Sequence, residues 1–193
     1  AINYDGSSPH RGDGFQFHVG TMRSKSRGFV AIKNADPQNS PIIKFNYLSH
    51  SDDLKDFRNA IRITRNILDQ PAFKDFAGQE IQPKPTVKSN RELDEFIKSS
   101  VESAFHPCGT CKMGDPADKE TVVTPECKVN GVENLFCADS SIFPSITNGN
   151  LNAPSIMVGE KAVDHILNKP LLPRENLVPV SYTHLRAHET KAN

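Results

Sequence analysis

The sequence predicts a small antiparallel sheet followed by helices, which is an α+β fold. Three short segments have the composition or alternation of strands: 14–19, 29–33 and 42–46. Three longer stretches place apolar residues at helical spacing: 52–69, 89–104 and 153–166. Residues 34–41 are rich in Pro, Asn and Asp, so we expect a hairpin-like connection between the second and third strands.

Capping residues mark where the first two helices should begin. The Ser-Asp-Asp run at 51–53 is expected to cap the first helix, with its acids at the positive end, and Pro71 to follow its last turn. Ser89 and Glu92 form the pattern of a capping box. The second helix that they begin should lead directly to His106.

Short apolar segments follow the second helix. Residues 122–132 predict a short hairpin with an Asn-Gly turn. Residues 135–138 have the apolar composition of a buried strand. The last helix is expected to begin near Ala153-Pro154, because proline is favoured in the first turn of a helix.

Composition and charge exclude several classes of protein. Lys plus Arg and Asp plus Glu balance at 23 each, so no net field attracts nucleic acid or an anionic membrane. The mean hydropathy of −0.50 is that of an ordinary globular protein, and no apolar run is long enough to span a bilayer. Four cysteines in 193 residues do not suggest a disulfide scaffold, so a reducing compartment is the simpler assumption.

Neither end of the sequence has the character of a natural terminus. The chain opens at Ala1 without an initiator Met, in mid-pattern, as expected of a piece of a longer protein. Residues 180–190 resemble a translated sequencing adapter, so we exclude the tail 174–193 from fold reasoning. His184 and His188 lie in that tail at metal-ligand spacing and receive no functional weight.

The run from Phe105 to Gly114, FHPCGTCKMG, is the most informative stretch of the sequence. A histidine with a near-neutral pKa can accept the proton of an alcohol that loses hydride. Pro107 and Gly109 should fix the backbone beside His106. From the residues alone, a purely structural histidine beside a turn is the open alternative.

The cysteines offer a rival chemistry, in which Cys108 and Cys111 form a thiol or metal-binding module without catalysis. Cys127 and Cys137 are ten residues apart and do not form a zinc knuckle. The CxxC follows a predicted helix, whereas a thioredoxin-like site follows a strand. Both features count against this module.

A second cluster follows about thirty residues later and spans 138–154. It supplies carboxamides, small residues and the start of a helix, whose free N–H groups favour negative charge. In the simplest interpretation Asn148-Gly149 is a turn and Asn152 is an N-cap.

Together the two clusters resemble the C-terminal part of the glucose-methanol-choline (GMC) family of flavin oxidoreductases, and the resemblance is closest to its choline-oxidising branch. His106, Gly109, Thr110, Met113 and Gly114 match the family's active-site motif. The resemblance implies FAD as cofactor and His106 as the catalytic base.

The resemblance also assigns roles within the second cluster. Asn150 would pair with His106 across the substrate oxygen as the second catalytic residue. Asp139, next to Ala138, matches the acidic residue beside the flavin's ribityl and pyrophosphate groups. The backbone at Asn152, Ala153 and Pro154 would approach the isoalloxazine ring.

The same resemblance implies the domain organisation and the activity. Residues 1–129 would form the substrate-binding domain, and residues 130–173 would return to complete an FAD-binding domain. No G-x-G-x-x-G motif occurs, so this piece alone is expected to be inactive. The whole enzyme would oxidise choline to betaine aldehyde, for glycine betaine synthesis, with another GMC alcohol dehydrogenase or oxidase as the alternative. A membrane-linked electron acceptor is expected, with a cytoplasmic or inner-face location, or a mitochondrial one in a eukaryote.

Overall fold

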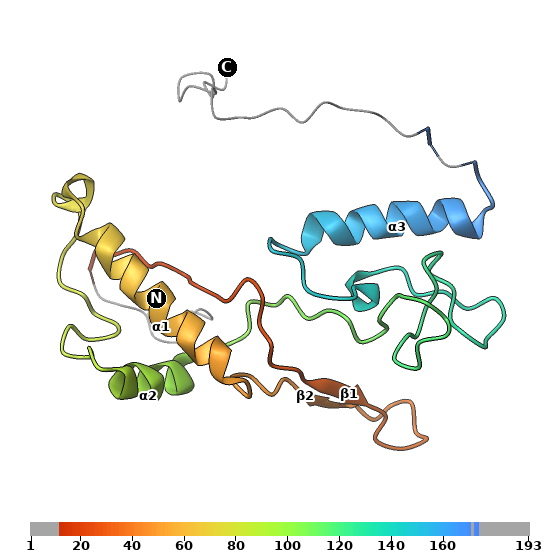
Figure 1. Cartoon of the computed structure of the whole chain (residues 1–193), viewed down its shortest axis with the longest axis horizontal. Helices are drawn as coiled ribbons and strands as arrows, with labels where there is room; N and C mark the ends of the chain where they lie inside the picture. The colour runs from red at the N-terminus through yellow and green to blue at the C-terminus, as the bar shows by residue number, and fades with distance from the viewer. Residues whose placement is uncertain (1–11, 171, 174–193) are drawn as a thin grey trace.

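The computed structural model describes residues 12–170, 172 and 173 (Figure 1). Its elements, in order, are β1 (Phe29–Ala31), β2 (Ile42–Lys44), α1 (Ser51–Leu68), the 3-10 helix η1 (Pro71–Phe73), α2 (Asn90–Ser100), the 3-10 helix η2 (Ser140–Ile142) and α3 (Asn152–Ile166). These elements confirm the α+β prediction. In the described part of the chain, no helix has the length and apolar character to cross a membrane. The predicted adapter-like tail, with His184 and His188, lies outside the described residues.

The sheet is a two-stranded antiparallel hairpin. Val30 of β1 pairs with Ile43 of β2, and the connection between the strands spans residues 32–41, which includes the predicted turn at 34–41. The prediction of a first strand at 14–19 is wrong, because the structure has no strand there. The two aromatic residues of this segment, Phe15 and Phe17, instead pack their rings on Phe73 of η1, at centroid distances of 6.4 and 6.1 Å.

Helix α1 begins at Ser51, and its first turn contains the predicted acidic residues Asp52 and Asp53. His50 is its N-cap and accepts a hydrogen bond from the Asp52 N–H, so the predicted Ser-Asp-Asp cap is wrong in detail. Asp53 is buried and accepts hydrogen bonds from Ser24, Lys25 and Ser26. The carboxylate therefore fastens the segment before β1 to the start of α1.

The capping box of the second helix is confirmed. The Ser89 hydroxyl accepts a 3.2 Å bond from the Glu92 N–H, and the Ser89 N–H donates to the Glu92 carboxylate at 2.9 Å. The prediction that this helix leads directly to His106 is wrong, because α2 ends at Ser100 and Val101 is its C-cap in extended conformation. Irregular chain therefore separates α2 from the histidine.

Replacing Ser89 with alanine should lower the free energy of unfolding by about 1 kcal/mol, since the first turn of α2 loses a capping acceptor. Urea unfolding of the complete polypeptide measures the change. Ser99→Ala, on an exposed site near the other end of α2, is the matched control and should cost clearly less. Equal losses in the two variants would contradict a capping role.

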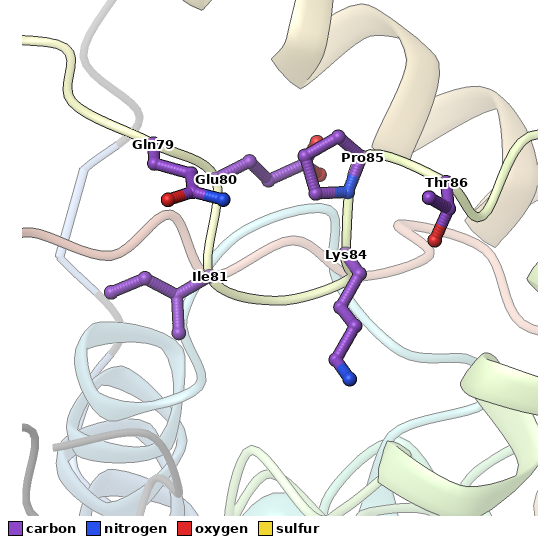
Figure 2. Close-up of a pocket in the computed structure, with 6 residues that line it drawn as sticks. All are labelled: Gln79, Glu80, Ile81, Lys84, Pro85 and Thr86. Atoms are coloured by element: carbon purple, nitrogen blue, oxygen red, sulfur yellow. The ribbon is translucent and has the colours of Figure 1, made fainter.

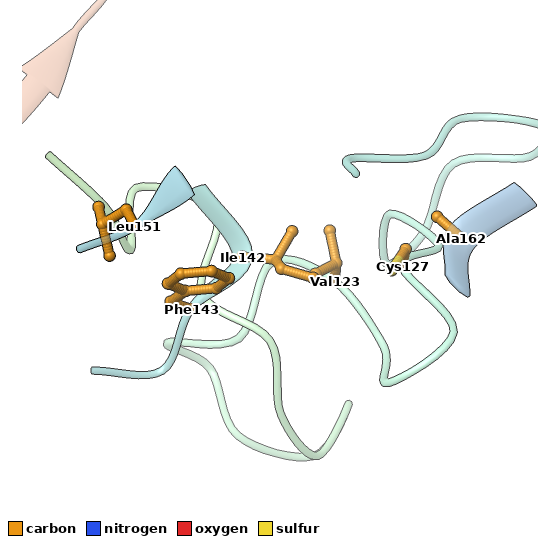
Figure 3. Packing of buried hydrophobic residues seen from close by; sticks show 6 residues of the cluster. All are labelled: Val123, Cys127, Ile142, Phe143, Leu151 and Ala162. Atoms are coloured by element: carbon orange, nitrogen blue, oxygen red, sulfur yellow. The ribbon is translucent and has the colours of Figure 1, made fainter. Parts of the chain in front are cut away.

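Two separate hydrophobic clusters hold the described residues together. In the first, Ile61 of α1 packs with Leu93 and Ile97 of α2. The second draws on the turn region, η2 and α3, and its six buried residues are drawn in Figure 3: Val123, Cys127, Ile142, Phe143, Leu151 and Ala162. This cluster has members on both sides of the expected boundary at 129 and 130, which stays a prediction.

The chain between α2 and α3 is held by isolated bridges and turns. Val123 bridges Met113 in parallel and Val129 in antiparallel fashion, and Lys128 bridges Phe136. The predicted hairpin at 122–132 thus exists as a single bridge. The predicted strand at 135–138 is likewise reduced to the bridge at Phe136, and Leu135 is 49% exposed. The apolar runs in these segments are shorter than a typical strand, so they form isolated bridges instead of full strands.

Candidate active site

His106 lies in irregular chain between α2 and the second hydrophobic cluster. The preceding residue, Phe105, has a φ of 58°, in the left-handed region that bulky residues rarely adopt. Its N–H donates to the Ser103 hydroxyl at 2.9 Å, which fixes this turn. The imidazole of His106 is half-buried and has no hydrogen-bond partner among the described residues. No hydrogen bond within the described residues therefore occupies its ring nitrogens.

The turn after His106 is fastened to η2 by backbone hydrogen bonds. The N–H groups of Gly109, Cys111 and Met113 donate to the carbonyls of Ser140, Ser141 and Ile142, at 3.2, 2.8 and 2.8 Å respectively. This ladder places the histidine-bearing segment beside the segment that carries Asp139. Sequence reasoning identified both segments but missed Ser140 and Ser141 as the residues that join them. The available signal was the Asp-Ser-Ser run, which is typical of a tight turn.

Asp139 begins η2 as its N-cap. Its side chain accepts a 2.8 Å hydrogen bond from the Ser141 N–H. Hydrogen bonds from the Ser141 side chain and then from its backbone lower the pKa of Asp139 below its ordinary value of 3.8, so the carboxylate is charged at neutral pH. The neighbouring Ala138 is exposed, and its carbonyl oxygen lies 3.9 Å from the position that a Cβ on Gly159 of α3 would occupy.

The N-terminus of α3 is open. Its N-cap is Leu151, which makes no side-chain capping bond, so the interpretation of Asn152 as N-cap is wrong. Asn152 and Ala153 are exposed in the first turn and Pro154 is half-buried. The first-turn N–H groups of α3 therefore have no side-chain acceptor from the N-cap residue.

Asn150 precedes this helix and is exposed. Its carboxamide has no hydrogen-bond partner in the part of the chain that the structure describes, and no hydrogen bond joins it to His106. The structure thus brings the His106 turn next to Asp139 and leaves Asn150 free. The pairing of His106 with Asn150 stays a prediction.

These groups fit a flavin dinucleotide by their chemistry. An ionised, exposed carboxylate at Asp139 can accept hydrogen bonds from ribityl or ribose hydroxyls. An uncapped helix N-terminus at Asn152 favours a ring that gains negative charge. The chemistry of this region is therefore compatible with FAD.

A metal centre finds no support in residues 12–170, 172 and 173. No group of three or more His, Cys, Asp or Glu residues there is arranged to hold a metal ion. All four cysteines are free, and only Cys127 is fully buried.

A shallow pocket lies away from these residues, on the loop between η1 and α2. Figure 2 shows its lining residues, which are Gln79, Glu80, Ile81, Lys84, Pro85 and Thr86. Arg65 of α1 holds this loop through Glu80 at 3.0 Å and through the Val87 carbonyl at 2.8 Å. None of the predicted site residues lines the pocket, so it is not the candidate active site.

Gly109 is required where the His106 turn meets η2. Its φ is +83°, and a Cβ added there would lie 3.1 Å from the Phe143 carbonyl oxygen. Gly109→Ala should destabilise the fold by about 1–2 kcal/mol from the backbone conformation alone, with a further loss from crowding. Gly131→Ala is the matched control, because Gly131 has a φ of +75° but open space around it. Urea unfolding measures the loss of stability in both variants. An equal loss would contradict crowding of the new Cβ against the Phe143 carbonyl oxygen.

The chain belongs to the GMC oxidoreductase family, whose model matches residues 24–159. Among curated relatives, it is 60% identical over 179 residues to the oxygen-dependent choline dehydrogenase of Brucella ovis, and 55% identical over 179 residues to that of Rhizobium rhizogenes. Each match covers 93% of this chain and 33% of the relative. The chain therefore spans about a third of the length of these relatives.

Solved structures give the same family. The chain resembles pyridoxine 4-oxidase from Mesorbium loti with a TM-score of 0.71 and 31% identity, over 78% of this chain and 29% of that one. A fungal aryl-alcohol oxidase matches with a TM-score of 0.69 and 32% identity, over 76% of this chain and 24% of that one. The predicted family is thus confirmed by sequence and by fold.

Proposed function

We propose that the complete protein is an FAD-dependent choline dehydrogenase and that this chain supplies its catalytic histidine. The observation that carries the proposal is the 60% identity, over 93% of the chain, to a relative named oxygen-dependent choline dehydrogenase. The relatives of known structure carry the names of other substrates, at about half that identity. The choline branch is therefore the better supported one.

His106 is the base in this proposal. Its imidazole accepts the hydroxyl proton of choline as the adjacent carbon loses hydride. Bound FAD supplies the hydride acceptor. Asn150 donates a hydrogen bond from its carboxamide to the substrate oxygen, which stabilises the alkoxide character that develops there. The alcohol thus loses one proton and one hydride and becomes betaine aldehyde.

The predicted cofactor contacts follow from the open groups described above. Asp139 and Ala138 lie on the segment joined to the His106 turn, where a ribityl or pyrophosphate group would be held. Asn152, Ala153 and Pro154 open α3, where the ring would be held. The two segments share one hydrophobic cluster, which supports a single cofactor site.

Two acceptors for the electrons can be distinguished by experiment. The relatives are named oxygen-dependent, whereas we expect a membrane-linked acceptor. The complete protein would then work in the cytoplasm or at the inner face of a membrane, or in a mitochondrion if the source is a eukaryote. Turnover with choline should be followed once by oxygen consumption and once, without oxygen, by reduction of a soluble quinone.

Substrate choice is tested by comparing choline with 3,3-dimethyl-1-butanol, its uncharged isostere. Aldehyde formation by the complete protein should show a kcat/KM at least about tenfold higher for choline, because aromatic and anionic groups favour a quaternary ammonium. Equal values would contradict recognition of the charge. Activity on another alcohol with none on choline would keep the family and discard the substrate.

A further inference from the structure

The backbone just before His106 adopts a conformation that is costly for the residue at that position. Phe105 has a φ of 58°, in the left-handed region, where the Cβ lies too close to the following carbonyl oxygen. The Phe105 ring is 70% exposed, so its burial does not offset this cost. Residues in such conformations persist only where the surrounding structure imposes them, and they cluster at functional sites. This strain lies directly before the predicted base.

The hydroxyl of Ser103 holds Phe105 in this conformation. Its oxygen accepts a hydrogen bond of 2.9 Å from the Phe105 N–H. A serine that accepts from the backbone two residues later closes a small turn. Ser103 is half-buried and lies beyond the end of α2 at Ser100, so no helix imposes this turn. Removing the hydroxyl therefore removes a contact that favours left-handed over extended Phe105.

The chain after His106 is fixed by different contacts. The Ser140 hydroxyl donates to the Pro107 carbonyl at 3.4 Å, and the Gly109 N–H donates to the Ser140 carbonyl at 3.2 Å. His106 thus lies between a turn at 103–105 and an attachment to η2 at 107–109. Its imidazole makes no hydrogen bond within the described residues, so the backbone on both sides sets the direction of the ring.

We propose that Ser103 and Phe105 are positioning residues for His106. The Ser103 hydroxyl holds Phe105 in the left-handed conformation, and that conformation directs the imidazole toward the hydroxyl of the substrate. The inference rests on the proposed function, in which His106 is the base. A group displaced by about 1 Å from its productive geometry can lose about 100-fold in rate. Weakening the turn should therefore slow the chemical step, although no group that touches the substrate is removed.

Replacing Ser103 with alanine in the complete protein should slow the reduction of bound flavin at saturating choline about 10- to 100-fold. Stopped-flow absorbance without oxygen measures this rate for bound flavin alone, so a general loss of stability does not alter it. The choline concentration that gives half the maximal rate should stay nearly unchanged, because the Ser103 hydroxyl is not a binding group.

Two further variants complete this experiment. Ser103→Thr keeps the hydroxyl and should be reduced nearly as fast as the parent. Ser99→Ala is the matched control, since it removes an exposed hydroxyl that bonds to the Phe96 carbonyl within α2, and it should also react as the parent does. An unchanged rate in Ser103→Ala, or a loss of equal size in Ser103→Thr, would overturn the proposal.

A pair of substitutions at Phe105 tests the conformation independently of Ser103. Asparagine tolerates the left-handed region, whereas the β-branched side chain of valine resists it. Both substitutions remove the ring, so a difference between them reports on the backbone. Phe105→Val should be reduced about tenfold more slowly than Phe105→Asn, which corresponds to the usual cost of the left-handed conformation. Equal rates would contradict a role for this conformation.

Crystal structures of the complete parent protein and of Ser103→Ala give a measurement that needs no turnover. In the variant, the φ of Phe105 should leave the left-handed region and the His106 imidazole should move relative to η2. An imidazole in its parent position would overturn the proposal. These structures decide the positioning even where choline leaves the flavin of the parent oxidised, a result that would contradict the proposed function alone.

Discussion

Replacing His106 with alanine should slow the reduction of bound flavin by choline about 100- to 10,000-fold, the usual contribution of a general base. The imidazole is half-buried and makes no hydrogen bond to the described residues, so its removal breaks no contact of the fold. Stopped-flow absorbance at the flavin maximum, without oxygen, measures the rate. Binding of flavin should be retained.

His165→Ala is the matched control for that variant. His165 is also half-buried, but it lies in the last turn of α3, at the far end from the predicted cofactor contacts. Its flavin should be reduced at nearly the unmutated rate. A His106→Ala variant that binds flavin and is reduced as fast as the control would refute the catalytic role of His106.

Replacing Asp53 with asparagine should destabilise the fold by about 3 kcal/mol, because both carboxylate oxygens accept hydrogen bonds and an amide keeps only one acceptor oxygen, so buried donors face an NH2 group. The side chain is 2% exposed. It accepts from the hydroxyls of Ser24 and Ser26 at 2.7 and 2.5 Å and from the Lys25 N–H at 2.9 Å. Urea unfolding of the complete protein measures the loss.

The pH dependence of stability gives an independent test of Asp53. Burial alone would raise its pKa, but the hydrogen bonds from Ser26, Lys25 and Ser24 prevail and lower the pKa from 3.8 to about 2. A lowered pKa stabilises the fold above pH 3.8, and this stability is lost as the pH falls toward 2. About 2 kcal/mol should disappear over that interval, and the Asp53→Asn variant should lack this part of the acid sensitivity.

Asp52→Asn is the matched control for Asp53. Asp52 is the preceding residue, but its side chain is 45% exposed and pairs with Lys25 across the surface. Exposed ion pairs contribute little to stability, so this variant should unfold almost as the parent does. If the two variants lose the same stability, Asp53 is not the anchor of the segment before β1.

Structural features that depend only on residues close together in the chain were predictable from the sequence. The capping box at Ser89 and Glu92, the hairpin of β1 and β2 and the start of α3 all depend on neighbouring residues. The burial of Asp53 was not predictable in this way, because its partners lie 27 or more residues earlier in the chain. From its position alone it belongs to an acidic first turn.

The same distinction applies to the candidate site. The motif around His106 and the run at Asp139 were each recognisable from the sequence, through their resemblance to the GMC family. That the two segments lie side by side was not predictable. Their contact depends on the backbone carbonyls of Ser140 and Ser141, and every residue type has such a carbonyl.

Exposed apolar side chains also limit what this chain alone can specify. Val30 on β1, Ile43 on β2 and Met157 on α3 are 51%, 56% and 66% exposed. Apolar surface of this extent usually contacts another part of a protein. The chain spans about a third of its curated relatives, which agrees with a site completed by residues from elsewhere.

An anaerobic titration of the complete, purified protein with choline tests the central claim most directly. The visible spectrum should show oxidised flavin before choline is added, and it should bleach as choline is added, with betaine aldehyde formed in equal amount. A protein that carries flavin and keeps its colour in excess choline would contradict choline oxidation. A protein that binds no flavin at all would contradict the assignment of FAD to this site.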